Sequence, residues 1–259
     1  MTRGSPADER KHSAWQQKFI VEERYLPAAS RRRLYTASVL LIAVGLVSFI
    51  LLLAAVLTHS GFERLDQPVE TWFDAQRSAG LTGFMIALAI IFGPVALPVI
   101  VLIVTVGWTV LARHAWRPLL LAAAMLSGVI LAQVIAPLVQ HPRPPVALML
   151  FGADHTFSFP SGHVLGTSDF LLVMAFLLAS RRRNARFTAA AVALAILGIL
   201  AQVASRLYLG YHWISDTTAS VALSMVVLGA VMAIDTKRTV RIPGEQVRGE
   251  LSQPQIHGT

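Results

Sequence analysis

Long apolar runs dominate this 259-residue chain, and its polar positions gather between them. About 18 to 20 apolar residues suffice to cross the hydrocarbon core of a bilayer. Such runs must be helical in lipid, because the backbone has no other hydrogen-bond partners there, and no alternation of period two indicates a barrel. The pattern predicts an all-α fold, a polytopic membrane bundle of six transmembrane helices. We expect these helices at residues 34–57, 81–111, 118–139, 161–179, 187–204 and 213–234.

The segments between and before these runs add detail to the bundle. Apolar residues recur at helical spacing within 62–73, which predicts a short interfacial helix between the first two spans. Gly93 and Pro94 interrupt the second run and predict a kink there. Residues 15–26 are expected to form a short helix that lies on the membrane surface.

The basic residues are distributed unevenly on the two sides of this predicted bundle. With six spans, 18 of the 22 lysines and arginines fall on the side that carries both termini. Cytoplasmic loops are enriched in these residues, so we expect both termini in the cytoplasm of a multi-pass protein of the cell (plasma) membrane. The chain divides into a cytoplasmic tail (1–33), a six-span domain (34–234) and a second cytoplasmic tail (235–259) that is predicted to be disordered.

The amino-acid composition excludes several kinds of functional site. The chain has no cysteine, which excludes a disulfide framework, a zinc–thiolate site and a thiol nucleophile. A net charge of +8 would suit nucleic acid, but the arginines flank apolar spans, and retention of cytoplasmic loops explains them better. No cluster of metal ligands is apparent, so we expect no metal, no cofactor and no nucleic-acid partner; the oligomeric state stays open.

The first extracytoplasmic loop, 140–160, and the start of the fourth span carry several polar groups. Arg143 lies between two prolines that stiffen the backbone, so it loses little entropy when it binds an anion. The sequence Pro160-Ser161-Gly162-His163 begins a membrane helix, where unsatisfied N–H groups favour an anion. Ser161 could add a donor, and His163 could protonate a leaving oxygen. The alternative is an ordinary serine cap beside an interfacial histidine.

The second extracytoplasmic loop, 205–212, leads into the sixth span. His212 and Asp216 are four residues apart and share one helix face. The carboxylate could accept a hydrogen bond from one ring nitrogen and leave the other free to attack. Arg206 offers a fork for phosphate oxygens. The alternative is that His212 and Asp216 only cap the helix, although Asp216 is expected to lie too deep for a cap.

Together these segments resemble the type 2 phosphatidic acid phosphatase family of membrane lipid phosphate phosphatases. The family pattern is a lysine seven residues before Arg-Pro, then Pro-Ser-Gly-His, then Ser-Arg followed after five residues by His and after three more by Asp. The second part is matched in full by 160–163. The third part is matched by Ser205, Arg206, His212 and Asp216. The first part is matched only at Arg143-Pro144, because Ala136 replaces the lysine and His141 replaces an arginine.

The resemblance implies a metal-independent hydrolase that acts on a lipid phosphate at the extracytoplasmic face. By this resemblance His212 forms a phosphohistidine, Asp216 orients it, and His163 acts as acid and then base. Arg143, Ser161, Gly162 and Arg206 bind the phosphate, with His141 as a possible accessory cation. Candidate substrates are an undecaprenyl or similar isoprenyl diphosphate of the cell envelope, phosphatidic acid and phosphatidylglycerol phosphate.

Two other functions share these motifs. A lipid phosphotransferase would pass phosphate from the same histidine to a second acceptor. A weakened pseudophosphatase or scaffold would fit the loss of positive charge at Ala136. One further group is Asp169, an intramembrane carboxylate that is costly unless it has a purpose. We expect Asp169 to be a structural hydrogen-bond partner.

Overall fold

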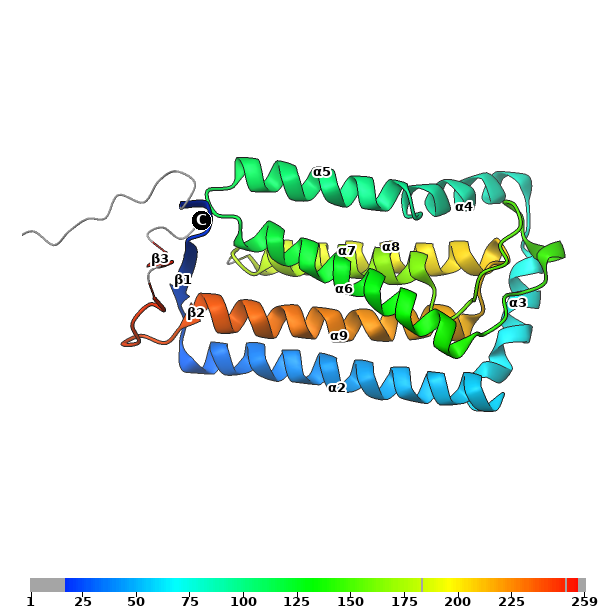
Figure 1. The fold of residues 1–259 in the computed structure, drawn as a ribbon, viewed down its shortest axis with the longest axis horizontal. Coiled ribbons are helices and arrows are strands. Elements are labelled where there is room, and N and C mark those ends of the chain that lie inside the picture. Colours follow the sequence, from blue (N-terminus) through cyan, green and yellow to red (C-terminus); the bar gives the residue numbers. More distant parts are fainter. Residues whose placement is uncertain (1–16, 183, 250, 256–259) are drawn as a thin grey trace, which may run out of the picture.

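A computed structural model describes residues 17–182, 184–249 and 251–255. The helical elements are α2 (Ala28–Thr58), η1 (Gly61–Leu65), α3 (Asp66–Ala75), α4 (Ala79–Ile91), α5 (Ala96–Leu111), α6 (Trp116–Val139), η2 (Val146–Leu148), α7 (Gly162–Ala179), α8 (Ala185–Tyr208) and α9 (Ile214–Thr239). The strands are β1 (Val21–Tyr25), β2 (Val240–Arg241) and β3 (Ser252–Pro254). The long helices run side by side along one axis (Figure 1).

The predicted membrane bundle is confirmed. Within the described residues, α2, α6, α7, α8 and α9 are each long and apolar enough to cross a membrane. A sixth span results if α4 and α5 are taken as one broken helix, bent by 50° at residues 92–95. This break lies at the predicted kink beside Gly93 and Pro94. Several spans are longer than the sequence predicted, since α2 begins at Ala28 and α9 continues to Thr239.

Close packing of α2 against α9 holds one side of the bundle together (Figure 1). A Cβ atom on Gly45 would lie 2.6 Å from the carbonyl oxygen of Ala222, and one on Gly229 would lie 2.8 Å from that of Ser38. The Ser38 hydroxyl donates to the Gly229 carbonyl oxygen at 2.6 Å. Small residues therefore allow the two backbones to approach, as is typical of helix pairs in membranes.

The short helices lie at one end of the bundle, which is named the outer end after the orientation expected from the sequence. The short helix predicted between the first two spans is confirmed as α3, which runs across this end (Figure 1). Arg77, just after α3, donates from Nη2 to the Leu148 carbonyl oxygen at 2.8 Å and from Nε to that of Tyr208 at 3.2 Å. Gly210 has φ +75°, and a Cβ there would clash with the Leu148 carbonyl. These contacts position loop 140–161 against the end of α8.

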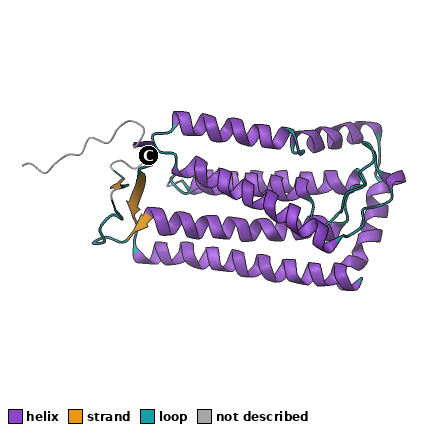
Figure 2. Ribbon diagram, in the orientation of Figure 1, coloured by secondary structure: helices purple, strands orange, loops and turns teal. Residues whose placement is uncertain are grey.

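The opposite end carries a small sheet that the sequence did not predict (Figure 2). Its order is β2-β1-β3, with β1 parallel to both neighbours. The helix expected at 15–26 is wrong for residues 21–25, which form β1, whereas residues 17 and 18 are helical; Trp15 lies outside the described residues. The tail expected to be disordered from 235 instead continues α9 and then supplies β2 and β3. Residues 250 and 256–259 of that tail lie outside the described residues.

Candidate active site

Four segments meet at the outer end of the bundle: loop 140–161, the start of α7, the end of α8 and the start of α9. They carry all the site residues predicted from the sequence. His141, Ser161, Arg206, His212 and Asp216 are buried there. The bundle thus brings together positions that lie up to 75 residues apart, as in the contact of His141 with Asp216.

His212 is held in one tautomer by its neighbours. Its Nδ1 lies 2.9 Å from the carbonyl oxygen of Ser158, which can only accept a hydrogen bond. Its Nε2 lies 3.1 Å from Nη1 of Arg143, which can only donate. The proton of the neutral ring therefore sits on Nδ1, and the lone pair on Nε2 faces the guanidinium. Burial, reinforced by the charges of Arg143 and Arg206, lowers the pKa of His212 to about 4.

The Asp216 carboxylate has hydrogen-bond partners other than His212. Its Oδ2 accepts hydrogen bonds from the Ser158 hydroxyl and, at 2.8 Å, from the backbone N–H of Trp213. The expectation that Asp216 lies too deep for a cap is therefore wrong: at the third position of α9, its carboxylate satisfies a donor at the helix start. The distance from Asp216 Oδ2 to His212 Nδ1 is 3.5 Å, too long for a strong hydrogen bond.

His141 is the closest histidine partner of Asp216. Its Nδ1 lies 2.9 Å from Asp216 Oδ1, and both side chains are buried. Burial opposes the charge on His141, but the hydrogen bond and charge of Asp216, with the charges of Asp66 and Glu63, outweigh it and raise the pKa of His141. Asp216 is thus shared by two histidines and one serine, and the orientation of His212 depends largely on Ser158.

Arg143 is fixed by a dense set of contacts. It donates to the Thr156 carbonyl oxygen at 3.1 Å, to the Thr156 hydroxyl at 2.9 Å and to the Tyr211 carbonyl oxygen at 2.7 Å. Its Nη2 also lies 3.1 Å from Oδ2 of Asp154. Burial opposes ionisation of Asp154, but hydrogen bonds from Thr156 and the charges of Arg143 and His212 hold its pKa below the usual value. An acidic side chain therefore balances one of the two arginines of the site.

Ser158, Asp154 and Thr156 were missed by sequence reasoning. Asp154 could have been noticed as an acidic residue in a loop that was expected to bind an anion. Ser158 is a polar residue between Phe157 and Phe159, a position at which burial needs a hydrogen-bond partner. No local pattern pointed to Thr156.

A cavity of about 480 Å³ opens beside these groups, and it is named the polar cavity after the few charged and polar side chains in its otherwise apolar wall. Arg206, Tyr211, Asp154 and His163 all line it. The guanidinium carbon of Arg206 lies 4.4 Å from the centre of the Tyr211 ring, and its buried Nε has no hydrogen-bond partner among the described residues. The cavity therefore combines a histidine with a desolvated arginine donor. Neither His212 nor Arg143 lines this cavity; both lie behind its wall, with Nη1 of Arg143 3.1 Å from Nε2 of His212.

Ser161 and Gly162 are placed differently from each other. Ser161 is fully buried and caps α7, its Oγ accepting from the Val164 N–H at 3.5 Å. It lines neither the polar cavity nor the groove described next. Gly162 does line that groove, and a Cβ at this position would meet no atom within 4 Å.

An apolar groove of about 530 Å³ leads away from the polar cavity between α5, α6 and α7. His163, Gly93 and Pro94 line both spaces, so the two are adjacent. A Cβ on Gly93 would lie 3.6 Å from Nε2 of His163. The break between α4 and α5 thus places a glycine against the histidine where the groove meets the cavity.

Two other predicted features have a clear location. Ala136 lies in the last turn of α6, where its carbonyl oxygen accepts from the Gln140 N–H at 2.9 Å. Asp169 points at Gly128, since a Cβ there would lie 2.1 Å from its Oδ2. Ser224 is the neighbour that can act as the hydrogen-bond partner expected for Asp169, although neither carboxylate oxygen has a partner of good hydrogen-bond geometry within the described residues.

Glu63, Asp66 and His141 form the one group of potential metal ligands within the described residues, with ligand atoms within 4.8 Å of one another. These atoms already have partners in the fold. Asp66 accepts from the Ser215 N–H at 2.9 Å and from its hydroxyl at 2.7 Å. Burial raises the pKa of Asp66 to about 6 despite these bonds. We assign Asp66 to anchoring the start of α9.

Comparison with known proteins agrees with this architecture. The sequence model of the PAP2 superfamily matches residues 117–239. Phosphatidylglycerophosphatase B of Bacillus subtilis is 24% identical over 200 residues, which cover 75% of this chain and 95% of the relative.

Two solved structures share the fold. The crystal structure of a transmembrane PAP2-type phosphatidylglycerolphosphate phosphatase from Bacillus subtilis has a TM-score of 0.67 at 21% identity, covering 74% of this chain and 94% of that one. Aquifex aeolicus LpxE has a TM-score of 0.52 at 18% identity, covering 66% and 95%. Residues 117–239 thus match the PAP2 superfamily, which confirms the family resemblance drawn from the motifs, and the bundle has the fold of a solved PAP2-type membrane phosphatase.

Proposed function

We propose that the protein hydrolyses a lipid phosphate through a phosphohistidine on His212. The observation that carries this proposal is the state of the His212 ring, which presents an unprotonated Nε2 to a guanidinium group. A nucleophilic imidazole needs a free lone pair and a fixed orientation. The lowered pKa keeps this ring neutral at physiological pH.

In the first step Nε2 of His212 attacks phosphorus and the bond from phosphorus to the lipid oxygen breaks. Arg143 must then transfer its Nη1 donor from Nε2 to a phosphate oxygen. Its contacts with Thr156 and Tyr211 hold the guanidinium within reach. The unpartnered donor of Arg206 supplies a second charge for the equatorial oxygens. His163, which faces the same cavity, donates a proton to the leaving oxygen.

In the second step His163 takes a proton from water, and the resulting hydroxide oxygen attacks phosphorus. The bond from phosphorus to Nε2 breaks, inorganic phosphate leaves, and His212 returns to its neutral form. Asp216 and Ser158 keep the ring oriented throughout, since the Ser158 carbonyl accepts from Nδ1. Every step uses protein side chains, so we expect turnover to persist in excess chelator.

The apolar groove supports a lipid substrate. Its walls come from three spans and it ends at His163, so a hydrocarbon chain in the groove would place its headgroup in the polar cavity. The curated Bacillus subtilis relative and the solved Bacillus subtilis structure are both named for phosphatidylglycerol phosphate, which we propose as the first candidate substrate. Phosphatidic acid is also a phosphate monoester, whereas an isoprenyl diphosphate would lose its terminal phosphoryl group with the lipid monophosphate as the leaving group; both belong in the same assay.

The excess of basic residues on one side supports an extracytoplasmic site with both termini in the cytoplasm. Modification of single engineered cysteines by an impermeant reagent would test this orientation, because the chain has no cysteine of its own.

The test is phosphate release by purified protein from these three lipids, for wild type and His212→Ala. We expect the variant to lose at least about 10³-fold in turnover. His155→Ala is the matched control, since His155 is exposed on the same loop. Trapping of a labelled phosphoenzyme in wild type and its absence in His212→Ala would identify the intermediate. Residual turnover close to wild type would refute the assignment.

The same assay separates the two alternatives. A phosphotransferase would release phosphate slowly and form a phosphorylated product when an acceptor alcohol is added. A pseudophosphatase, the alternative suggested by Ala136 in place of the lysine, would show no turnover on any lipid. Ala136→Lys would add positive charge at the end of α6 and is expected to increase the affinity for substrate.

A further inference from the structure

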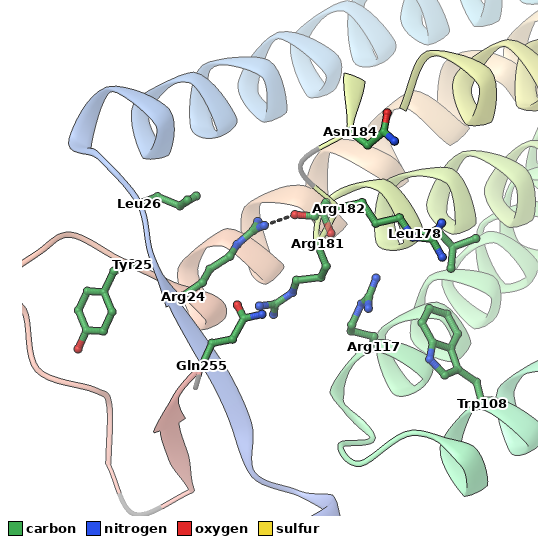
Figure 3. Close-up of a pocket in the computed structure, with 11 residues that line it drawn as sticks. Arg24, Tyr25, Leu26, Trp108, Arg117, Leu178, Arg181, Arg182, Asn184 and Gln255 are labelled. Carbon is green, nitrogen blue, oxygen red and sulfur yellow. Dashed lines mark hydrogen bonds between the residues drawn. The ribbon is translucent and has the colours of Figure 1, made fainter. Parts of the chain in front are cut away.

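A second cavity, of about 980 Å³, lies at the end of the bundle opposite the candidate active site. Its walls come from β1, the end of α5, the start of α6, the turn between α7 and α8, and Gln255 after β3 (Figure 3). These segments are far apart in the sequence and meet only in the folded protein.

Four arginines converge on this cavity: Arg24, Arg117, Arg181 and Arg182 (Figure 3). No aspartate or glutamate is among the described residues that line it. Like charges that close repel one another, and in a partly desolvated space this repulsion is screened weakly. The cavity thus holds a concentration of positive charge that its own walls do not neutralise.

Several guanidinium donors in the cavity have no acceptor. The buried Nε and Nη2 of Arg117 and the buried Nη1 of Arg181 have no hydrogen-bond partner within the described residues. Arg181 uses Nη2 on the Glu22 carbonyl oxygen at 3.4 Å, and Arg24 donates to the Ser180 carbonyl oxygen. A buried donor without an acceptor costs free energy, so an oxygen-rich anion would satisfy what the protein leaves open.

The nearby acidic residues are engaged elsewhere. Glu23 is fully buried and pairs with Arg241, its Oε2 lying 2.6 Å from Nε. Asp235 accepts from Nε1 of Trp116 at 3.0 Å and does not line the cavity. Asp235 still attracts the Arg117 guanidinium, but no carboxylate is part of the cavity wall among the described residues.

Aromatic rings hold two of the guanidinium planes in place. The Arg117 guanidinium lies 5.2 Å from the centre of the Trp108 ring, and that of Arg182 lies 4.2 Å from the Phe187 ring. Such stacking limits the freedom of a long side chain before any ligand arrives. Arginines that served only to orient the spans would need to lie on the correct side and nothing more, whereas these converge on one space with their donors buried.

We propose that this cavity is a binding site for a phosphate group, separate from the active site. Arginine forks match phosphate oxygens in geometry and charge. Trp108 and Leu178 add an apolar wall at the ends of two spans, so the phosphate could belong either to an anionic phospholipid of the adjacent leaflet or to a soluble compound. Because the cavity joins β1, the turn after α7 and Gln255, an occupied site would hold the terminal segments against the bundle.

Two probes distinguish these sources. Inorganic phosphate, added at constant ionic strength to the full chain in neutral detergent, is scored by the shift in unfolding temperature. Phosphatidylglycerol in phosphatidylcholine nanodiscs is scored by native mass spectrometry as retained lipid per protein. Both are repeated in Arg143→Gln, which weakens anion binding at the outer site, so that the remaining signal reports on the inner cavity. A response to phosphate identifies a soluble ligand, and a response only to the lipid identifies a headgroup.

The variants decide whether the arginines form the site. Arg117→Gln is expected to weaken the responding probe about tenfold, the loss of one or two charge-assisted hydrogen bonds. Arg182→Gln, at an exposed position, is the second variant in case the first does not fold. Arg113→Gln is the matched control, exposed on the same α5–α6 connection but outside the cavity. The proposal is overturned if neither probe binds, or if the control weakens binding as much as the cavity variants.

Discussion

The two ends of this bundle treat positive charge in opposite ways. At the outer end, Arg143 has three hydrogen-bond acceptors besides His212 and is balanced by Asp154. At the other end, four arginines line a cavity without an acidic residue among its described walls, and several donors lack an acceptor. At the first end Arg143 is therefore satisfied without a ligand, although Arg206 beside it keeps one open donor, whereas at the second end Arg117 and Arg181 both leave donors open.

This difference teaches how binding and catalysis make different demands on a site. A catalytic group must already be oriented when the substrate arrives, because reorganisation during the reaction costs rate. A binding site can instead leave donors unsatisfied, because the ligand then recovers that free energy. The outer end accordingly contains a shared hydrogen-bond network, and the inner end contains convergent, stacked arginines.

The largest loss of turnover is expected from Asp216→Asn, which tests whether catalysis needs the hydrogen-bond network of the outer end. The amide keeps the size of the side chain but cannot accept from both His141 and Ser158 as the carboxylate does. We expect turnover to fall about 10³-fold, as expected when the orienting acid of a histidine is lost. Turnover within about threefold of wild type in a monodisperse, folded preparation would show that the network is not required.

A smaller loss is expected from Arg143→Lys, which keeps the charge and removes the fork. Lysine cannot reach Thr156 and Tyr211 together as the guanidinium does. We expect kcat/KM for the lipid phosphate to fall about 100-fold. Arg113→Lys, at the exposed position on the opposite end, should leave kcat/KM unchanged. Equal effects of the two substitutions would contradict the assignment of Arg143.

The protonation of His212 gives a direct measurement of its environment. Its pKa is lowered to about 4 by burial and by the two arginines, against about 6.5 for a free histidine. The neutral, nucleophilic ring is therefore present above pH 4 and is lost as the pH falls through that value. In ¹⁵N-histidine spectra, the signal that disappears in His212→Ala should remain that of a neutral ring from pH 8 to about 5. If the His212 signal instead titrates near pH 6.5, the ring is exposed to solvent and the buried environment described for it is wrong.

The smallest effect is expected from Asp154→Asn, which makes the outer site more like the inner one. Removing this carboxylate takes away the partner that lies 3.1 Å from Arg143 Nη2. The guanidinium should then bind anions more tightly, and inhibition by inorganic phosphate should strengthen by about three- to tenfold. Weaker inhibition would mean that Asp154 positions Arg143 more than it competes with phosphate.

Much of the fold could be predicted from the chain because membrane spans carry a strong signal. The apolar runs located every long helix, and Gly93 and Pro94 located the break between α4 and α5. The small sheet could not be found in this way. Its strands are only two to five residues long, and β1 pairs with segments more than 200 residues away. Such pairing depends on the bundle bringing the two ends of the chain together.

The parts of the candidate site that depend on local residue spacing could be predicted from the sequence. The contacts between distant segments could not. His212 and Asp216 are four residues apart, so their proximity was predictable. The contact of Asp216 with His141 joins α9 to a loop 75 residues earlier, and the role of Ser158 depends on one backbone carbonyl. No sequence pattern reports which carbonyl a ring nitrogen will face.

The parallel pairing of β1 with β2 and β3 has a consequence for biogenesis. The ribosome makes β1 before any span and makes its two partners after the last one. Residues 21–25 therefore have no strand partner until residues 240–241 and 252–254 have been synthesised. The sheet can thus close only after the last span has been synthesised.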